Sequence, residues 1–170
     1  MAALFFHDAC TVYSLALVDL LPRIKQLFGD KLRLAPTVMR EVQYLLRDQQ
    51  DLLSQVQEVF FTVDMPNPSE LAQTQVFKSY FDTPGHDGNT DNLGEAETLA
   101  IIVCRYTCSD NVLFVSDDED AVVIAQEQEV VKGAFGTRTL LELLEKKRLV
   151  SSQERADILA QLREEGRYIL

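Results

Sequence analysis

The fold is decided by the segment VLFVSDDEDA, residues 112–121. Its first four residues, 112–115, form an unbroken apolar run, which is typical of a strand buried on both faces. The run ends in Ser116, Asp117 and Asp118. A buried strand that ends in carboxylates predicts a parallel sheet with acidic side chains at the edge where its strands end.

A second segment of this kind opens the chain: LFFHD, residues 4–8. It predicts a strand at 4–7 that ends at Asp8. Further strands are expected at 32–35, 59–63 and 130–131. Helices are expected at 11–21, 23–28 after a break at Pro22, 36–47, 52–57, 69–81, 94–106, 121–128, 137–147 and 151–166. Because strands alternate with helices, we predict an α/β fold with a mostly parallel sheet and helices on both faces.

The composition is that of an ordinary soluble globular domain. The chain has 170 residues, 46% of them hydrophobic and 25% charged, which fits a single domain over 1–170. Its C-terminal helix is expected to begin with a capping box formed by Ser151 and Glu154. The turn-rich segment 82–92 is expected to be either a functional lid or a mobile connection.

The formal net charge is −11. It excludes a nucleic-acid binder that acts mainly through a basic surface. A nucleic-acid role therefore requires a local patch or metal ions. Alternatively, the acidity simply keeps a cytoplasmic protein soluble.

The three cysteines, Cys10, Cys104 and Cys108, form no recognisable disulfide framework. We expect buried free thiols in a reducing compartment, and hence a cytoplasmic protein. The first residues do not look like a signal peptide. Since no stretch approaches the ~18 apolar residues of a membrane span, we expect no membrane partner.

Acidic side chains gather where the predicted strands and helices begin or end. In open parallel sheets, ligands bind at the carboxyl ends of the strands, where the strand order reverses. A cluster of carboxylates there repels itself, and a hard cation such as Mg²⁺ or Mn²⁺ relieves the repulsion. Each acid alone also has a structural explanation, such as a helix cap or a favourable interaction with a helix dipole. The candidates are Asp8, Glu41, Glu95, Glu97, Asp117, Asp118 and Asp120.

The order of these motifs resembles the PIN domain, the nuclease fold of VapC-type toxins. The closest likeness is to the PIN-like subgroup with a Gly-Glu-Ala-Glu helix start. The likeness covers about residues 3–150, ahead of the C-terminal helix at about 151–166. It rests on DACTVYSLA (8–16) leading on to LLP (20–22), Glu41, GEAETLA (94–100), VSDDEDA (115–121) and Gly136-Thr137 before a leucine-rich helix.

The resemblance implies a three-layer α/β/α fold and metal-dependent cleavage of RNA. Carried over by position, the catalytic acids are Asp8, Glu41, Glu97 and Asp118. The metal ligands are Asp8, Glu97 and Asp118, with Asp117, Glu95 and Asp120 as neighbours that can replace them. The implied cofactor is Mg²⁺ or Mn²⁺. The implied function is a ribonuclease that is the toxin of a toxin–antitoxin pair, with RNA, an antitoxin protein and a second copy of the chain as partners.

Two departures from the family pattern keep a second hypothesis open. Cys10 stands where the family usually has Ser, Thr or Asn, and Val122 stands where the subgroup often has Arg. These differences allow a PIN-like protein-interaction module with weak or no nuclease activity. A third class, a phosphatase or receiver domain with an acidic pocket, is disfavoured. A haloacid-dehalogenase-type phosphatase has Asp-x-Asp on its first strand, whereas Asp8 is followed by Ala9 and Cys10. A receiver domain needs a Lys at a later strand end, for which Lys132 is only a loose candidate.

Overall fold

The computed structural model describes residues 3–81 and 92–170. Its strands are β1 (Leu4–His7), β2 (Leu32–Arg33), β3 (Val112–Val115) and β4 (Val131–Phe135). They form one sheet in the order β2-β1-β3-β4, and every pairing is parallel. The predicted parallel sheet is confirmed.

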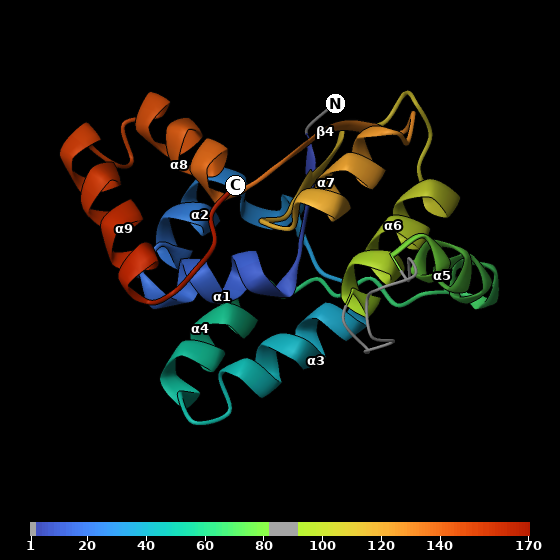
Figure 1. The fold of residues 1–170 in the computed structure, drawn as a ribbon, viewed down its shortest axis with the longest axis horizontal. Helices are drawn as coiled ribbons and strands as arrows, with labels where there is room; N and C mark the ends of the chain where they lie inside the picture. Colours follow the sequence, from blue (N-terminus) through green and yellow to red (C-terminus); the bar gives the residue numbers. More distant parts are fainter. Residues whose placement is uncertain (1–2, 82–91) are drawn as a thin grey trace.

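The helices cover both faces of this sheet, which confirms the three-layer α/β/α fold. Figure 1 shows α1, α2 and α8 on one side and α6 and α7 on the other. A short 3₁₀ turn, η1 (Gly29–Lys31), leads into β2. The helices are α1 (Ala9–Leu17), α2 (Leu21–Phe28), α3 (Pro36–Leu45), α4 (Gln50–Val59), α5 (Pro68–Phe81), α6 (Leu93–Arg105), α7 (Glu119–Gln126), α8 (Thr137–Lys146) and α9 (Ser152–Glu164).

The core lies between these layers and is centred on β1 and β3. Phe6 pairs with Phe114 in the sheet, and both side chains are fully buried. Adjacent residues on a strand point to opposite faces. Because Phe5 and Val115 are also buried, both faces of these central strands are covered. This explains why their sequences are continuously apolar rather than alternating.

Several predicted element boundaries differ from the structure. The strand predicted at 59–63 is wrong, because Val59 ends α4 and only Val63 forms an isolated bridge, with Leu34. Val56 and Val59 are both buried, so the packing of α4 keeps Val59 in the helix against its β propensity. The strand predicted at 130–131 is longer, since β4 continues through Gly133 to Phe135.

Other predictions meet mixed outcomes. The capping box of Ser151 and Glu154 at the start of α9 is confirmed. The predicted burial of the three cysteines is wrong, because all three are exposed. Residues 82–91 of the turn-rich segment lie outside the described residues. Within the described ranges, no helix is long and apolar enough to span a membrane.

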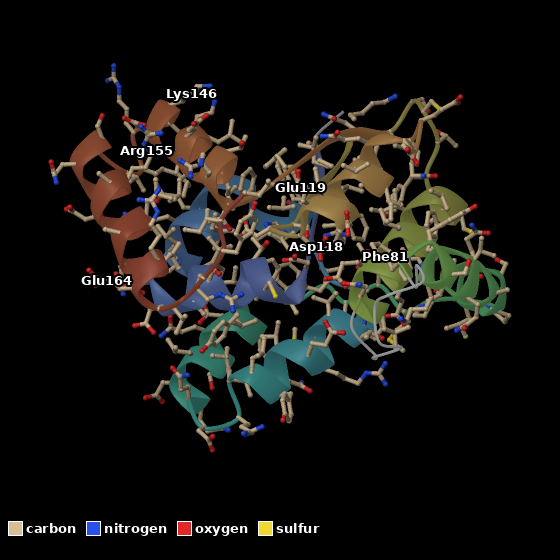
Figure 2. All side chains as sticks on the ribbon, viewed as in Figure 1. Phe81, Asp118, Glu119, Lys146, Arg155 and Glu164 are labelled. Carbon is tan, nitrogen blue, oxygen red and sulfur yellow. The ribbon has the colours of Figure 1, made fainter. Side chains whose placement is uncertain are left out.

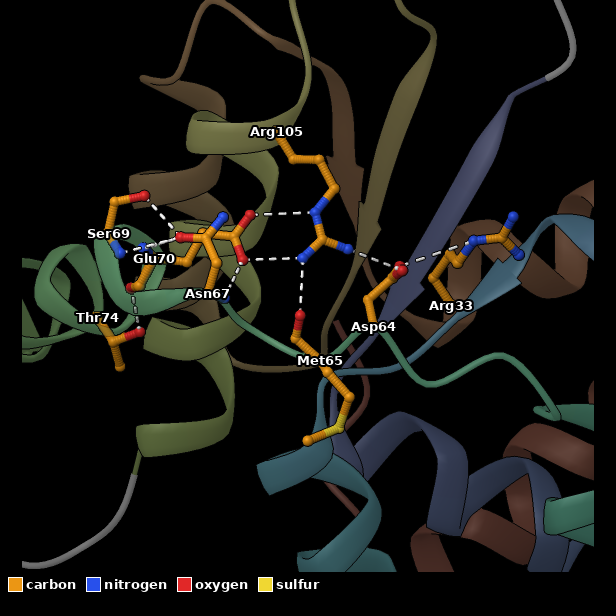
Figure 3. A network of polar contacts seen from close by, with 8 residues as sticks. All are labelled: Arg33, Asp64, Met65, Asn67, Ser69, Glu70, Thr74 and Arg105. Carbon is orange, nitrogen blue, oxygen red and sulfur yellow. Dashed lines mark hydrogen bonds and ion pairs between the residues drawn. The ribbon is translucent and has the colours of Figure 1, made fainter.

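A polar network around Arg105 joins the end of α6 to the start of α5 (Figure 3). The Arg105 guanidinium donates to both carboxylate oxygens of Glu70, at 3.0 and 2.8 Å, and to Asp64 Oδ1 at 2.9 Å. Asn67 N–H also donates to Glu70, at 2.7 Å. Burial of Glu70 opposes its ionisation, but the hydrogen bonds from Arg105 and Asn67 prevail and lower its pKa. This buried carboxylate is therefore fully compensated.

Substituting Arg105→Ala should lower the free energy of unfolding by about 2–4 kcal/mol, because it leaves Glu70 charged, buried and without its cation. Urea unfolding measures the change. Arg163→Ala, at an exposed position of α9, is the matched control and should stay within about 0.5 kcal/mol of wild type. Equal effects of the two substitutions would contradict this account of the network.

Candidate active site

The strand order places a topological switch point between β1 and β3. From β1 the chain turns to one side to form β2, and it then crosses to the other side to form β3. His7 and Val115, the last residues of the two strands, are paired, and Asp8 N–H donates to Val115 O at 3.0 Å. This is where open parallel sheets bind ligands.

Asp8 is fully buried at this point and holds the two strand ends together. Its Oδ1 caps α1 by accepting from Thr11 N–H at 2.6 Å, and its Oδ2 accepts from Ser116 Oγ at 2.5 Å. Burial raises the pKa of Asp8 to about 6 and the charge of Asp117 adds to the rise, against the hydrogen bonds from Ser116 and Thr11. Ser116 Oγ in turn accepts from Asp118 N–H at 3.0 Å.

Glu41, on α3, lies against Gly94 at the start of α6. Gly94 makes this approach possible: a Cβ there would lie 2.8 Å from Glu41 Oε2 and 3.0 Å from Val38 Cγ2. Burial raises the pKa of Glu41 to about 7, and the charges of Asp8 and Glu97 add to this, while a hydrogen bond from Gly94 N–H opposes it.

Glu95, the next residue on α6, is a buried carboxyl whose negative charge is poorly compensated. It is 8% exposed, and its Oε2 has no hydrogen-bond partner among the described residues. Burial raises its pKa to about 8, and the charges of Asp8, Glu41 and Asp118 contribute further. Glu95 is thus an uncompensated buried carboxyl, in contrast to the paired Glu70.

These acids line one cavity of about 1110 Å³. Four separate parts of the chain bring them there: the ends of β1 and β3, the helix α3 and the start of α6. Figure 2 shows Asp118 and Glu119 near the middle of the molecule, whereas Arg155 and Glu164 lie at its outer edge. The acidic residues of the lining are Asp8, Glu41, Glu95, Asp117, Asp118, Glu119 and Asp120.

Not every predicted site residue faces this cavity. Glu97 is absent from the lining, and its Oε2 accepts from Thr37 N–H at 2.8 Å. It satisfies the N-terminus of α3, where the cap residue Ala35 has no side-chain acceptor. Glu97 as a ligand remains a prediction from the resemblance, and Glu95 is the member of the pair that lines the cavity.

Asp117 lines the cavity, but its oxygens are occupied. Its Oδ1 accepts from Thr137 N–H at 2.7 Å and from Leu170 N–H at 3.1 Å, and its Oδ2 accepts from Thr137 Oγ1 at 2.5 Å. Asp117 therefore ties the end of β3 to the start of α8. Asp118 caps α7 through one oxygen, Oδ1, which accepts from Ala121 N–H at 2.9 Å.

The two departures from the family pattern lie in different surroundings. Cys10 lines the cavity next to Asp8. Val122 is 7% exposed and belongs to the hydrophobic core. Val122 is not part of the cavity lining.

Sequence reasoning missed part of the lining. Arg40 and Tyr44 stand four residues apart on α3, a spacing that places them on one helix face. The segment after α9 contributes Gly166, Arg167 and Tyr168. The spacing on α3 was a usable signal, but nothing in the sequence links the C-terminal segment to residues 8 or 118.

The chemistry of the cavity suits a hard divalent cation. Its potential ligands are carboxylate oxygens, which Mg²⁺ and Mn²⁺ prefer, and the unpartnered Oε2 of Glu95 is an available donor. Within residues 3–81 and 92–170, no three His, Cys, Asp or Glu side chains are grouped closely enough to hold a metal ion. The donors share one cavity without forming a ready-made cage.

Comparison with known proteins supports the fold. The structure is similar to the crystal structure of PAE2754 from Pyrobaculum aerophilum, with a TM-score of 0.57 and 18% sequence identity. The match covers 86% of this chain and 98% of that one. No protein-family model and no curated protein matches the sequence.

The raised pKa values predict an unusual pH dependence of stability. With EDTA present, the free energy of unfolding should rise as the pH falls from about 8.5 to 6.5. In this range the folded protein takes up protons at Glu95 and Glu41, whose pKa values are about 8 and 7. In the unfolded chain both groups have their ordinary pKa of 4.5, so they stay ionised over this pH range. Protons are therefore taken up by the folded state alone, and this uptake stabilises it. Urea unfolding across this pH range measures the slope.

The substitution Glu95→Gln should flatten this slope, because Glu95 has the highest pKa of the three carboxyls Asp8, Glu41 and Glu95. Glu164→Gln on the exposed side of α9 is the matched control and should leave the slope unchanged. His7, whose pKa burial lowers to about 4 from an ordinary 6.5, opposes the trend as the pH approaches 6.5 and falls below it. A slope that Glu95→Gln leaves unaltered would contradict the conclusion that Glu95 is an uncompensated buried carboxyl.

Proposed function

We propose that the protein is a metal-dependent endoribonuclease of the PIN type. One observation carries the proposal: acids from four separate segments line a single cavity at the switch point, and one of them, Glu95, keeps a buried oxygen without a partner. A stable fold does not need this crowding: together with burial, which is the larger cause, it raises the pKa values of Asp8, Glu41 and Glu95. A phosphodiester-cleaving site that uses a cation does need it.

The residues of the cavity divide into two roles. Asp8, Glu95 and Asp118 would hold the cation after moving closer together, because within the described residues no three such side chains are grouped closely enough as they stand. Glu97 takes this role in the resemblance. Glu41, with a pKa of about 7, is suited to accept or return a proton near neutral pH. A bound Mg²⁺ or Mn²⁺ would supply a water of lowered pKa and positive charge beside the phosphate.

The proposed reaction is hydrolysis of an RNA phosphodiester. A water oxygen attacks phosphorus and one proton of the water passes to Glu41. The P–O bond to the leaving ester oxygen breaks, and Glu41 returns the proton to that oxygen, which leaves a hydroxyl on one fragment and a phosphate monoester on the other. The acidic cavity repels RNA by itself, so the cation also explains how a chain of net charge −11 accepts a polyanion.

Substituting Asp8→Asn should abolish saturable Mn²⁺ binding in calorimetry and lower RNA cleavage at least ~100-fold, because it removes a cation ligand and a negative charge. Asparagine is also a good helix cap, so α1 should still form. Cleavage is followed with an end-labelled single-stranded RNA in Mn²⁺.

Asp157→Asn, on the exposed side of α9, is the matched control and should bind and cleave like wild type. A folded wild-type protein that neither binds Mn²⁺ nor cleaves RNA would overturn the nuclease proposal. The protein-interaction module would then be the better hypothesis. Cleavage that persists in Asp8→Asn would instead place the activity outside this cavity.

The resemblance to VapC-type toxins extends the proposal to a toxin of a toxin–antitoxin pair. Induced expression in a bacterial host should then arrest growth, and expression of Asp8→Asn at the same level should not, because the arrest depends on RNA cleavage. Colony counts and culture density after induction measure the effect. Equal growth arrest by both proteins would contradict a toxic action through this site.

A further inference from the structure

The C-terminal segment, residues 166–170, returns from the end of α9 to the middle of the molecule (Figure 1). Gly166, Arg167 and Tyr168 of this segment line the cavity. Gly166 turns the chain with a φ of 68°, and Arg167 N–H donates back to Leu162 O at 2.9 Å. This is the Schellman arrangement, in which a left-handed glycine ends a helix and redirects the chain. The direction in which the segment leaves α9 is therefore fixed locally.

Two anchors then hold the segment in place. Arg167 donates to Ser14 Oγ at 3.2 Å and to Cys10 O at 3.3 Å, and its guanidinium lies 5.2 Å from the centre of the Tyr13 ring. These contacts tie it to α1, the helix that Asp8 caps. The segment is thus attached directly beside the proposed catalytic acids.

The second anchor lies at Leu170. Its N–H donates to Asp117 Oδ1 at 3.1 Å, and its O accepts from Arg138 N–H at 3.2 Å. Gly136 leaves room for this contact, because a Cβ there would lie 2.6 Å from Leu170 O. The segment is fixed at both ends of the stretch that borders the cavity.

Tyr168 stands between these anchors and lines the cavity with 66% of its surface exposed. Tyr44 on α3 lines the same cavity and is 68% exposed. The lining also holds two arginines, Arg40 and Arg167, among its acids. Exposed aromatic rings next to arginines are the means by which proteins bind single-stranded nucleic acids, through stacking on unpaired bases.

The cavity is larger than the acids require. Pockets for small ligands measure roughly 300–1,000 Å³, and this one has about 1110 Å³. A cation and one phosphate would fill only part of it. The remaining space, where the two tyrosines lie, can take the bases that flank the phosphate.

We propose that Tyr168 and Tyr44 bind substrate by stacking on the unpaired bases next to the cleaved phosphate, and that the C-terminal segment is a fixed wall of this subsite. The inference rests on the proposed function and adds to it Tyr44, within the region that carries the family resemblance, and Arg167 and Tyr168, which lie beyond that region. Arg167 is a positioning residue, because it acts on substrate through the placement of Tyr168.

Binding of a fluorescent single-stranded oligoribonucleotide, measured by anisotropy, tests the stacking independently of cleavage. Tyr168→Ala and Tyr44→Ala should each weaken binding roughly 5- to 100-fold, as expected for the loss of one stacked base. Tyr168→Phe should bind like wild type, because it keeps the ring. Tyr80→Ala is the matched control, since Tyr80 is 59% exposed on α5 and lies outside the cavity lining.

The kinetic and metal readouts separate this subsite from the catalytic acids. In Tyr168→Ala the KM for RNA should rise while kcat and Mn²⁺ binding stay near their wild-type values. Arg167→Ala should weaken RNA binding in the same way, and its effect should be largely lost in a Tyr168→Ala background. A role of Arg167 in stability alone would give the same added effect in both backgrounds.

Three results would overturn the subsite: RNA binding that is unchanged in Tyr168→Ala and Tyr44→Ala, no RNA binding by the wild type, or faster cleavage in Tyr168→Ala. The last would mean that the segment covers the cavity rather than contacting substrate. Failure of the nuclease proposal looks different, because RNA binding would then depend on the two tyrosines while cleavage and Mn²⁺ binding were absent.

Discussion

The hydroxyl of Ser116 is the contact on which the site depends. It donates to Asp8 and accepts from the backbone of Asp118, so it joins the ends of two parallel strands that are far apart in the sequence. The pairing of β1 with β3 sets this geometry, and the apolar side chains of both strands stabilise the pairing from both faces of the sheet. The free energy of burying the apolar core thus offsets the repulsion between the like charges at its edge.

The buried acids Glu70 and Glu95 lie in two different electrostatic environments. Glu70 has a guanidinium and a backbone N–H, and its pKa is lowered. Glu95 has no partner for one of its oxygens, and its pKa is raised to about 8. The fold thus compensates Glu70 fully and leaves one oxygen of Glu95, at the switch point, without a hydrogen-bond partner in the described part of the chain. Such a concentration of perturbed groups in a cavity is typical of functional sites.

The sequence predicts the parts of the site that depend on strand ends. Asp8 and Asp118 follow continuous apolar runs, and the reversal of strand order brings them together as expected. It does not decide between Glu95 and Glu97, because both lie near the start of α6, two residues apart, and only the packing of α3 against α6 separates them. The packing sends Glu97 to Thr37 N–H and leaves Glu95 in the cavity. The C-terminal segment has no sequence signal, since its place depends on tertiary contacts alone.

Two glycines allow distant segments to meet at the cavity. The missing side chain of Gly94 leaves room for the Glu41 carboxylate against α6. The missing side chain of Gly136 leaves room for both Asp117 and Leu170 at the start of α8. Neither has a positive φ, so the reason for glycine at both positions is close approach and not backbone freedom. The resemblance includes both residues in its motifs without giving a reason for them. The structure supplies this reason: a Cβ at either position would collide with the carboxylate of a residue of the site, Glu41 at Gly94 and Asp117 at Gly136.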